Sequence, residues 1–161
     1  MRTLLLLLVS VTAAFAQAPP DLQLRSRERP GHAMVVAQPS SVEVDAGAKV
    51  TLFVDVTPNP NIHVYAPGSK DFIPVTVKLE PQANLKVGKV IYPRSETMTF
   101  ADEKVPVFQK PFRLAQEVTF SGRLEPGTTV PVNGTVNFQA CDDKVCFPPE
   151  TTHVTWSLKI R

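Results

Sequence analysis

The sequence lacks the features that mark several protein classes. It has only two cysteines, so no second cysteine pair is present to complete a closed zinc site. Positive charge is only slightly in excess, because 17 Lys and Arg against 15 Asp and Glu give a net charge of +2, and the chain has no basic cluster. Nucleic acid and anionic membranes are therefore not expected as partners. Long proline-free stretches are also missing: after the first 18 residues none exceeds 18 residues, which excludes long helices and coiled coils.

The residues that are present favour a single, mostly β domain. A length of 161 residues is enough for one domain. Hydrophobic residues make up 43% of the chain and charged residues 20%, so the chain can bury a core and differs from disordered sequences. The 16 prolines are about twice the usual share, which again disfavours helices.

The first residues have the pattern of a secretory signal peptide. Arg2 is followed by an apolar run and then by Ala14-Phe15-Ala16, which puts small residues at the two positions that a signal peptidase reads. The alternative, a membrane anchor, needs about 20 apolar residues, and this run is shorter. We expect residues 1–16 to be cleaved and the mature protein, with no other membrane span, to lie in the periplasm or outside the cell. Both compartments permit disulfides.

Alternating apolar residues predict a series of strands after a polar leader. Residues 17–38 show no sustained alternation and are expected to form the leader, with the domain covering residues 39–161. The clearest alternation places Val50, Leu52, Val54 and Val56 on one face. Similar runs occupy residues 75–79, 112–120, 130–138 and 154–160. Turn residues lie at 58–61, 66–68, 125–127 and 133–134, the last being an Asn-Gly pair typical of a tight hairpin.

These runs correspond to seven to nine short strands with no helical period. We therefore predict an all-β fold, an immunoglobulin-like β-sandwich, with a Greek-key barrel as the alternative.

The two cysteines bracket four residues between two predicted strands, as expected at the tip of a hairpin. If Phe138 and Ala140 face the core, Cys141 points the opposite way, toward solvent. A disulfide from Cys141 to Cys146 would close a loop of only six residues, worth about 2 kcal/mol in the chain-entropy model. Such a bridge is a poor staple for the fold, whereas exposed disulfides exchange readily with an incoming thiolate.

Other readings of the cysteine pair stay open from the residues alone. Asp142 and Asp143 disfavour a thiolate and Lys144 favours one, so we expect no strongly acidified thiol, which suits a passive relay. An inert hairpin disulfide is a second reading. A metal site using His153 as a third ligand is the weakest, because a fourth ligand is missing and a lone histidine on a strand is expected at the surface. No G-x-S-x-G motif supports a hydrolase.

The cysteine segment resembles a known family. Residues 136–141 read VNFQAC and residues 146–151 read CFPPET, which is similar to the amino-terminal periplasmic domain of the thiol:disulfide interchange protein DsbD. The resemblance extends loosely from about Val35 to Ile160. It implies an immunoglobulin-like domain whose cysteine pair accepts electrons from a thioredoxin-like domain and passes them to disulfide isomerases and cytochrome-maturation thioredoxins. It also implies that Cys146 forms the mixed disulfide with a partner and that Cys141 resolves it.

The resemblance further implies a cap loop over the cysteines. The stretch from Phe100 to Pro106 matches it, with Asp102 and Glu103 as the acids that open the family's loop. The aromatic residue of that loop is missing here, so shielding would be either weaker or done by Phe100, Phe108 or Phe147. The spacing also departs from the family, with four residues between the cysteines instead of five. The alternative is that the two acids are ordinary solvated loop charges.

The residues and the resemblance together predict a site and its partners. The residues expected to flank the cysteines are Tyr65, Asp142, Asp143, Lys144, Phe147, Pro148 and Pro149. No cofactor and no metal is expected, and a monomer is expected. Because the chain ends at Arg161 without an electron conduit, its electron donor is expected to be a membrane disulfide reductase or a thioredoxin-like domain, with periplasmic thiol-disulfide proteins as acceptors. The alternatives are a secreted binding module with a structural disulfide and, more remotely, a copper or zinc carrier.

Overall fold

Twelve strands make up the secondary structure of residues 31–161, which the computed structural model describes without residues 46, 101 and 123. The strands are β1 (Ala33–Pro39), β2 (Glu43–Val44), β3 (Lys49–Pro58), β4 (His63–Tyr65), β5 (Thr76–Leu79), β6 (Leu85–Ile91), β7 (Glu96–Phe100), β8 (Glu103–Phe108), β9 (Phe112–Phe120), β10 (Thr129–Phe138), β11 (Ala140–Cys141) and β12 (Glu150–Ile160). No helix in this part of the chain is long and apolar enough to cross a membrane. The predicted signal peptide lies outside the described residues.

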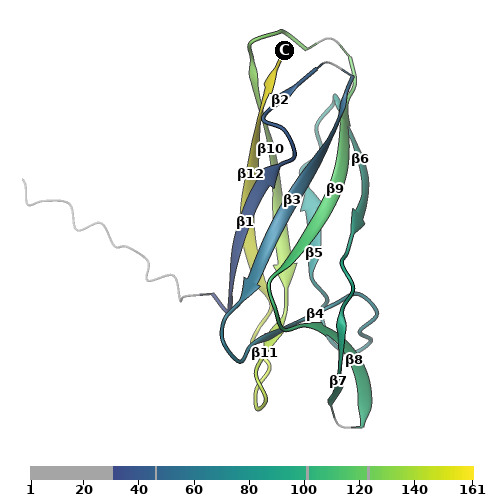
Figure 1. Ribbon diagram of the computed structural model, residues 1–161, viewed down its shortest axis with the longest axis vertical. Coiled ribbons are helices and arrows are strands. Elements are labelled where there is room, and N and C mark those ends of the chain that lie inside the picture. Colours follow the sequence, from purple (N-terminus) through teal and green to yellow (C-terminus); the bar gives the residue numbers. More distant parts are fainter. Residues whose placement is uncertain (1–30, 46, 101, 123) are drawn as a thin grey trace, which may run out of the picture.

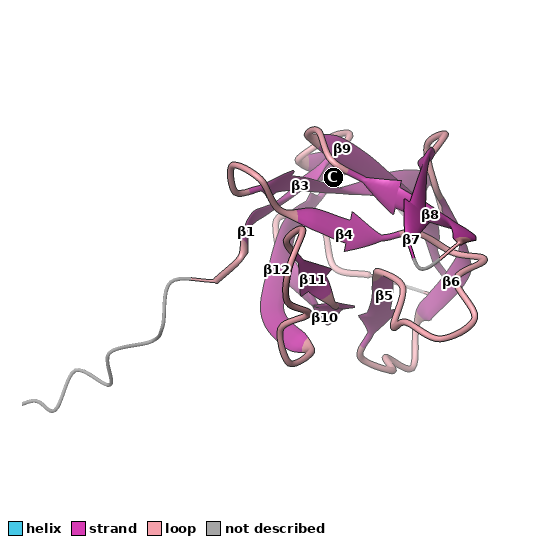
Figure 2. Cartoon of the chain, turned by 90° about the horizontal axis from the view of Figure 1, so that it is seen from below, coloured by secondary structure: helices cyan, strands magenta, loops and turns pink. Residues whose placement is uncertain are grey.

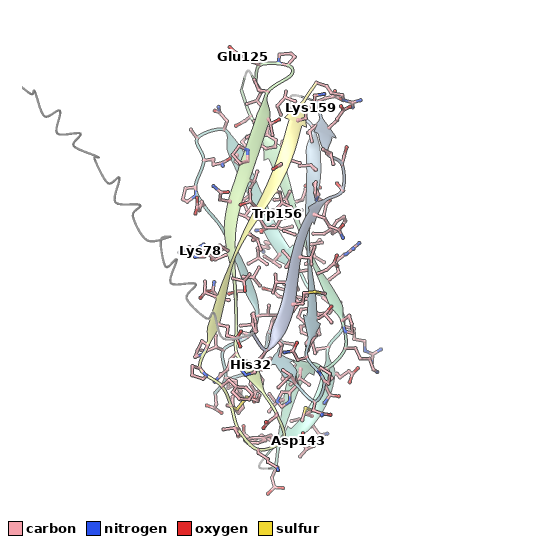
Figure 3. The ribbon with its side chains drawn as sticks, turned by 90° about the vertical axis from the view of Figure 1, so that its left-hand side faces the viewer. His32, Lys78, Glu125, Asp143, Trp156 and Lys159 are labelled. Atoms are coloured by element: carbon pink, nitrogen blue, oxygen red, sulfur yellow. A yellow bond between two sulfur atoms is a disulfide. The ribbon has the colours of Figure 1, made fainter. Side chains whose placement is uncertain are left out.

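Two four-stranded sheets form the immunoglobulin-like sandwich (Figure 1). One has the order β1-β3-β9-β6 and the other β2-β12-β10-β5. The alternation predicted for residues 50–56 is observed, since every second residue of β3 is buried. These side chains meet those of β10 and β12 in the main core. Trp156 of β12 is 1% exposed, and its indole nitrogen donates to the carbonyl oxygen of Phe53 on the opposite sheet at 3.0 Å (Figure 3).

Two sequence expectations about this sandwich are corrected. The leader was expected to reach residue 38, but β1 already begins at Ala33 and pairs with β3. Its pattern is hard to detect because Met34 and Val36 on its outer face are also apolar. The Asn133-Gly134 pair is not a turn, because it lies inside β10. Glycine is required there for a different reason: a Cβ atom would lie 2.8 Å from the Lys78 carbonyl oxygen of β5.

A third sheet closes one end of the sandwich. It has the order β11-β4-β8-β7 and, in Figure 2, is seen from below. The two faces of this sheet contribute side chains to two different hydrophobic clusters. Val64 belongs to the main core, whereas Tyr65, Val105 and Val107 form a small second cluster together with Cys141. The four strands of this sheet contribute to a total of twelve, which is above the expected seven to nine.

The stretch expected to be a cap loop is instead a β-hairpin within this sheet. Phe100 ends β7 and Glu103 begins β8, and the two strands pair along their whole length. Asp102 lies in the turn with φ 66°, in the left-handed region that a hairpin turn requires. The pairing was not predicted because Pro106 and the charged residues of β8 obscure the alternation of Val105 and Val107.

Candidate redox site

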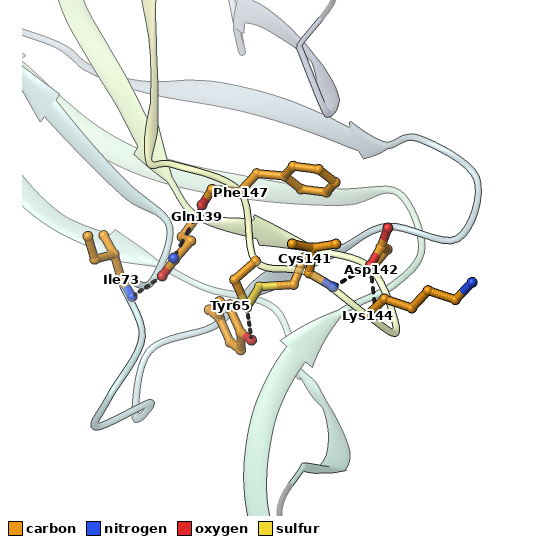
Figure 4. The surroundings of a disulfide bond; sticks show 9 residues. Tyr65, Ile73, Gln139, Cys141, Asp142, Lys144 and Phe147 are labelled. Atoms are coloured by element: carbon orange, nitrogen blue, oxygen red, sulfur yellow. Dashed lines mark hydrogen bonds between the residues drawn. A yellow bond between two sulfur atoms is a disulfide. The ribbon is translucent and has the colours of Figure 1, made fainter.

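The two cysteines close a hairpin turn at the end of the sandwich opposite the C-terminus (Figures 1 and 4). Cys141 and Cys146 form a disulfide with their Cα atoms 4.1 Å apart. Asp142 shapes the turn, since its Oδ1 accepts hydrogen bonds from the backbone nitrogens of Lys144 and Val145, each at 2.7 Å. These bonds lower the pKa of Asp142, so the carboxylate that shapes the turn stays ionised to a lower pH than an ordinary aspartate.

The two sulfurs differ in accessibility. Cys141 is 1% exposed, whereas Cys146 is exposed. Ala140 and Cys141 do point in opposite directions, as the alternation predicted, but the expectation that Cys141 faces solvent is wrong. The reason is the third sheet, because its face covers Cys141 with Val105 and Val107. Cys146 is therefore the cysteine that an attacking group is expected to reach.

Tyr65 lies directly beside the exposed sulfur. Its hydroxyl oxygen is 3.5 Å from Cys146 Sγ, and because a disulfide sulfur carries no proton, the hydroxyl is the donor. Burial raises the pKa of Tyr65, so it remains a protonated donor. The structure thus brings Tyr65 to the cysteines, where the sequence placed it.

A row of aromatic rings runs from Tyr65 to the tip of the β7–β8 hairpin. Phe72 stacks on Tyr65 with ring centroids 4.1 Å apart, and Phe100 meets Phe72 edge to face at 5.9 Å. Phe100 is 45% exposed at the outer end of the row. Phe72 was not found from the sequence, because it lies in an irregular loop between β4 and β5 and no periodicity marks it.

The other expected shielding residues lie elsewhere. Phe108 is 4% exposed in the main core and stacks on Phe112 at 4.1 Å, so it does not cap the disulfide. Phe147 stacks on His32 at 3.7 Å and packs against the main core. In Figure 4 its ring points away from the disulfide. Its backbone is next to the cysteines, but its ring packs on His32, the residue before β1.

Gln139 ties the cysteine hairpin to the loop that carries Phe72. Its side-chain nitrogen donates to the Phe147 carbonyl oxygen at 3.3 Å, and its side-chain oxygen accepts from the Ile73 backbone nitrogen at 3.2 Å (Figure 4). The segment after the hairpin, Pro148-Pro149, is exposed. Gln139 is part of the VNFQAC motif, but the motif by itself does not indicate that this side chain braces the hairpin.

The charged residues around the site are solvent-facing. Asp102 and Glu103 are exposed at the hairpin tip, and no hydrogen bond or ion pair joins either to the cysteine hairpin within the described ranges. Asp143 and Lys144 are exposed on the cysteine hairpin itself. The hairpin therefore presents mixed charge around the accessible sulfur.

One histidine departs from expectation. His63 is only 5% exposed, although a lone histidine on a strand was expected at the surface. It lies on β4 directly opposite Cys141 and meets Tyr65 edge to face at 5.4 Å. No group of three or more His, Cys, Asp or Glu side chains within residues 31–161, apart from the three undescribed positions, is arranged to hold a metal ion.

The fold and this site define a class of protein: an immunoglobulin-like β domain with a short-loop disulfide at one end. Residues 32–157 match the family described as the N-terminal domain of the thiol:disulfide interchange protein DsbD. The match covers most of the chain, and the chain belongs to this family. The resemblance inferred from the cysteine motif is thereby confirmed. No curated protein sequence matches the chain.

Two solved structures are similar in fold. The N-terminal periplasmic domain of ScsB from Proteus mirabilis matches with a TM-score of 0.51 and 16% identity, over 89% of this chain and 49% of that one. The N-terminal domain of DsbD from Neisseria meningitidis in the reduced form matches with a TM-score of 0.48 and 17% identity, over 71% of this chain and 82% of that one. This chain thus corresponds to about half of the ScsB chain.

Proposed function

We propose that this protein is a periplasmic thiol:disulfide exchange relay that works through the Cys141/Cys146 pair. The observation that carries the proposal is the difference between the sulfurs, since Cys146 is exposed and Cys141 is 1% exposed. An exchange protein needs one sulfur that a partner can reach and a second that is held nearby to complete the reaction. Membership of a family of thiol:disulfide interchange domains supports the same activity.

The proposed exchange has two steps. A partner thiolate attacks Cys146 Sγ, a new disulfide forms between partner and Cys146, and Cys141 leaves with the electron pair of the broken bond. A second thiol of the partner then attacks the partner sulfur that is bonded to Cys146, and Cys146 leaves as a thiolate. Both cysteines are then reduced and the partner is oxidised. In the opposite direction, Cys146 attacks a client disulfide and Cys141 displaces the client.

The proposed partners follow from this chemistry. The electron donor is a thioredoxin-like domain or a membrane disulfide reductase, and the acceptors are periplasmic thiol-disulfide proteins. Contacts with both are weak and transient, because the same small surface must release one partner before it receives the other. We propose that the chain works as a monomer.

The aromatic row takes the role that the family assigns to its cap. Tyr65 covers one side of Cys146, Phe72 backs Tyr65, and Phe100 extends the row to the hairpin tip. In this proposal, Asp102 and Glu103 at the same tip contribute charge for partner recognition.

The reduction potential of the pair tests the proposal. Purified mature protein is equilibrated with glutathione or dithiothreitol buffers, and free thiols are counted. A relay is expected between about −270 and −180 mV, the range spanned by thioredoxin and disulfide isomerase. A potential well below about −300 mV would contradict the relay and favour the alternative, a binding module with a structural disulfide.

A matched pair of variants tests which sulfur is attacked. Cys141→Ser retains the exposed sulfur and is expected to accumulate a stable mixed disulfide with oxidised glutathione, detected by mass. Cys146→Ser retains only the buried thiol and is expected to react at least about tenfold more slowly. Equal rates for the two variants would contradict the proposed assignment.

A further inference from the structure

His63 and Cys141 are opposed residues on neighbouring strands. β4 and β11 are antiparallel, and their register pairs His63 directly with Cys141. Side chains of directly opposed residues lie on the same face of a sheet, with Cβ atoms about 5 Å apart. Tyr65, two residues along β4, shares that face and reaches Cys146 Sγ. Each cysteine thus has its own polar neighbour on β4.

The buried position of Cys141 creates a chemical difficulty that a neighbouring base would solve. Only a thiolate attacks a disulfide, and burial in apolar surroundings disfavours the thiolate. Cys141 is 1% exposed among Tyr65, Val105 and Val107, none of which can accept its proton. His63, 5% exposed, is the titratable group paired with it.

The surroundings of His63 suit a proton acceptor. Burial lowers its pKa, and this effect outweighs the opposing influence of Asp143 and Asp142, so the imidazole is neutral at pH 7. A pocket of about 380 Å³ lies beside it, lined by exposed residues that include Asn61, Lys110 and Asp143. The charged groups facing His63 are therefore the two aspartates of the cysteine hairpin and Lys110 beyond β8. The pocket connects the imidazole to solvent, with which it can exchange a proton.

We propose, building on the exchange function proposed above, that His63 accepts the proton of the Cys141 thiol when Cys141 resolves a mixed disulfide. The Cys141 S–H bond breaks and its proton passes to the imidazole. The Cys141 sulfur then forms a bond with Cys146 Sγ, and the partner leaves as a thiolate with the electron pair of the broken mixed disulfide. The imidazolium afterwards releases its proton to water through the pocket. In the opposite direction the same proton returns from the imidazolium to Cys141.

A two-phase reaction separates this step from the first attack. The fully reduced protein is mixed with 5,5′-dithiobis(2-nitrobenzoic acid), an aryl disulfide whose released thiolate is coloured. The first phase, attack by Cys146, depends on reagent concentration. The second phase, displacement of the second aryl thiolate by Cys141, is independent of reagent concentration. The second phase thus reports on the deprotonation of Cys141.

The expected result is specific to that phase. At pH 7, His63→Gln slows the second phase at least about tenfold, because a general base contributes about 10²–10⁴-fold and a free thiol is only a few per cent ionised there. The first phase is unchanged. With pH, the variant's second phase keeps rising past the ordinary thiol pKa of about 8.5, because burial raises the pKa of Cys141, whereas the wild-type rate levels off at a lower pH. The two rates converge once the pH exceeds the Cys141 pKa, which also shows that the site is intact. His153→Gln, at an exposed histidine on β12, is the matched control and behaves as wild type.

Three outcomes overturn the proposal. If His63→Gln has the wild-type second phase at pH 7, His63 takes no proton. If both phases slow equally at every pH, its role is structural. If wild type shows no second phase at all, the exchange function itself fails together with the role of His63. Thermal unfolding of each variant in the reduced state confirms that the compared proteins are folded.

Discussion

Reduction of the disulfide is expected to weaken the domain only slightly. The bond joins residues five positions apart and so closes a loop of six residues. The chain-entropy model assigns such a loop about 2 kcal/mol of stability. A domain of this size has an unfolding free energy of about 5–15 kcal/mol, so the reduced protein stays folded. Cys141 also keeps its apolar neighbours when reduced, because β4 and β8 position them independently of the sulfur bond.

The stabilisation of about 2 kcal/mol also lowers the reduction potential of the disulfide. By a thermodynamic cycle, a disulfide that stabilises the folded state by about 2 kcal/mol has a potential about 45 mV more negative in the folded protein than in the unfolded chain. A shift of this size is smaller than the span of about 90 mV between thioredoxin and disulfide isomerase, so it is compatible with the proposed relay. A protein that cycles between redox states gains from this, since each cycle leaves its partner surface intact.

Urea unfolding of the wild-type protein, with and without dithiothreitol, measures the effect. We expect a loss of about 2 kcal/mol on reduction, or a fall in melting temperature of about 6–10 °C. The double variant Cys141→Ala/Cys146→Ala is the control, and the reductant should not alter its stability. A loss above about 4 kcal/mol would refute this reasoning, because the hairpin would then hold the fold together and reduction would disturb the whole end of the sandwich.

Two further predictions concern the aromatic row and an ion pair far from it. Phe72→Ala removes the ring that stacks on Tyr65 beside Cys146, so reduction of the disulfide by dithiothreitol should become about 2–10-fold faster. The control variant Ile91→Ala, at an exposed site of β6, should leave the rate unchanged. Equal rates for both variants would show that Phe72 does not shield the disulfide. Arg113 lowers the pKa of Asp55 by a side-chain hydrogen bond. The ion pair therefore stabilises the fold at pH values above 3.8, the pKa of Asp55 in the unfolded chain, and this stabilisation is lost as the pH falls through the lower pKa of the folded state. Asp55→Asn should therefore cost less than about 1 kcal/mol at pH 7 and nothing once Asp55 is protonated, as measured by urea unfolding at both pH values; a cost that persists in acid would contradict this.

The sequence was sufficient for the sandwich and for its family. Alternation in β3 and β12 identifies the core face because the side chains of a strand alternate strictly between two faces. The spacing of Cys141 and Cys146 between two such runs predicts a hairpin disulfide, and the structure contains one. The flanking motif led to the family, which the comparison confirmed.

Alternation failed wherever a strand did not have one buried and one solvated face. β1 carries apolar residues on both faces, and β6 is interrupted by a bulge between Val87 and Val90. Gly134 has the signature of a turn, but it sits within β10 because the backbone of β5 approaches too closely for any side chain. Local sequence carries no record of such an approach from a distant strand.

The tertiary structure alone decided the chemistry of the site. Alternation places Cys141 opposite Ala140, but only the third sheet determines that this second face is covered by Val105 and Val107 instead of water. The same packing brings Phe72 onto Tyr65 and sets His63 opposite Cys141. His63 is 78 residues from Cys141, Val105 and Val107 are 36 and 34 residues from it, and Phe72 lies in an irregular loop, so no periodicity links these neighbours. Which residues share a face is a local property of a strand, whereas what covers that face depends on the packing of the whole chain.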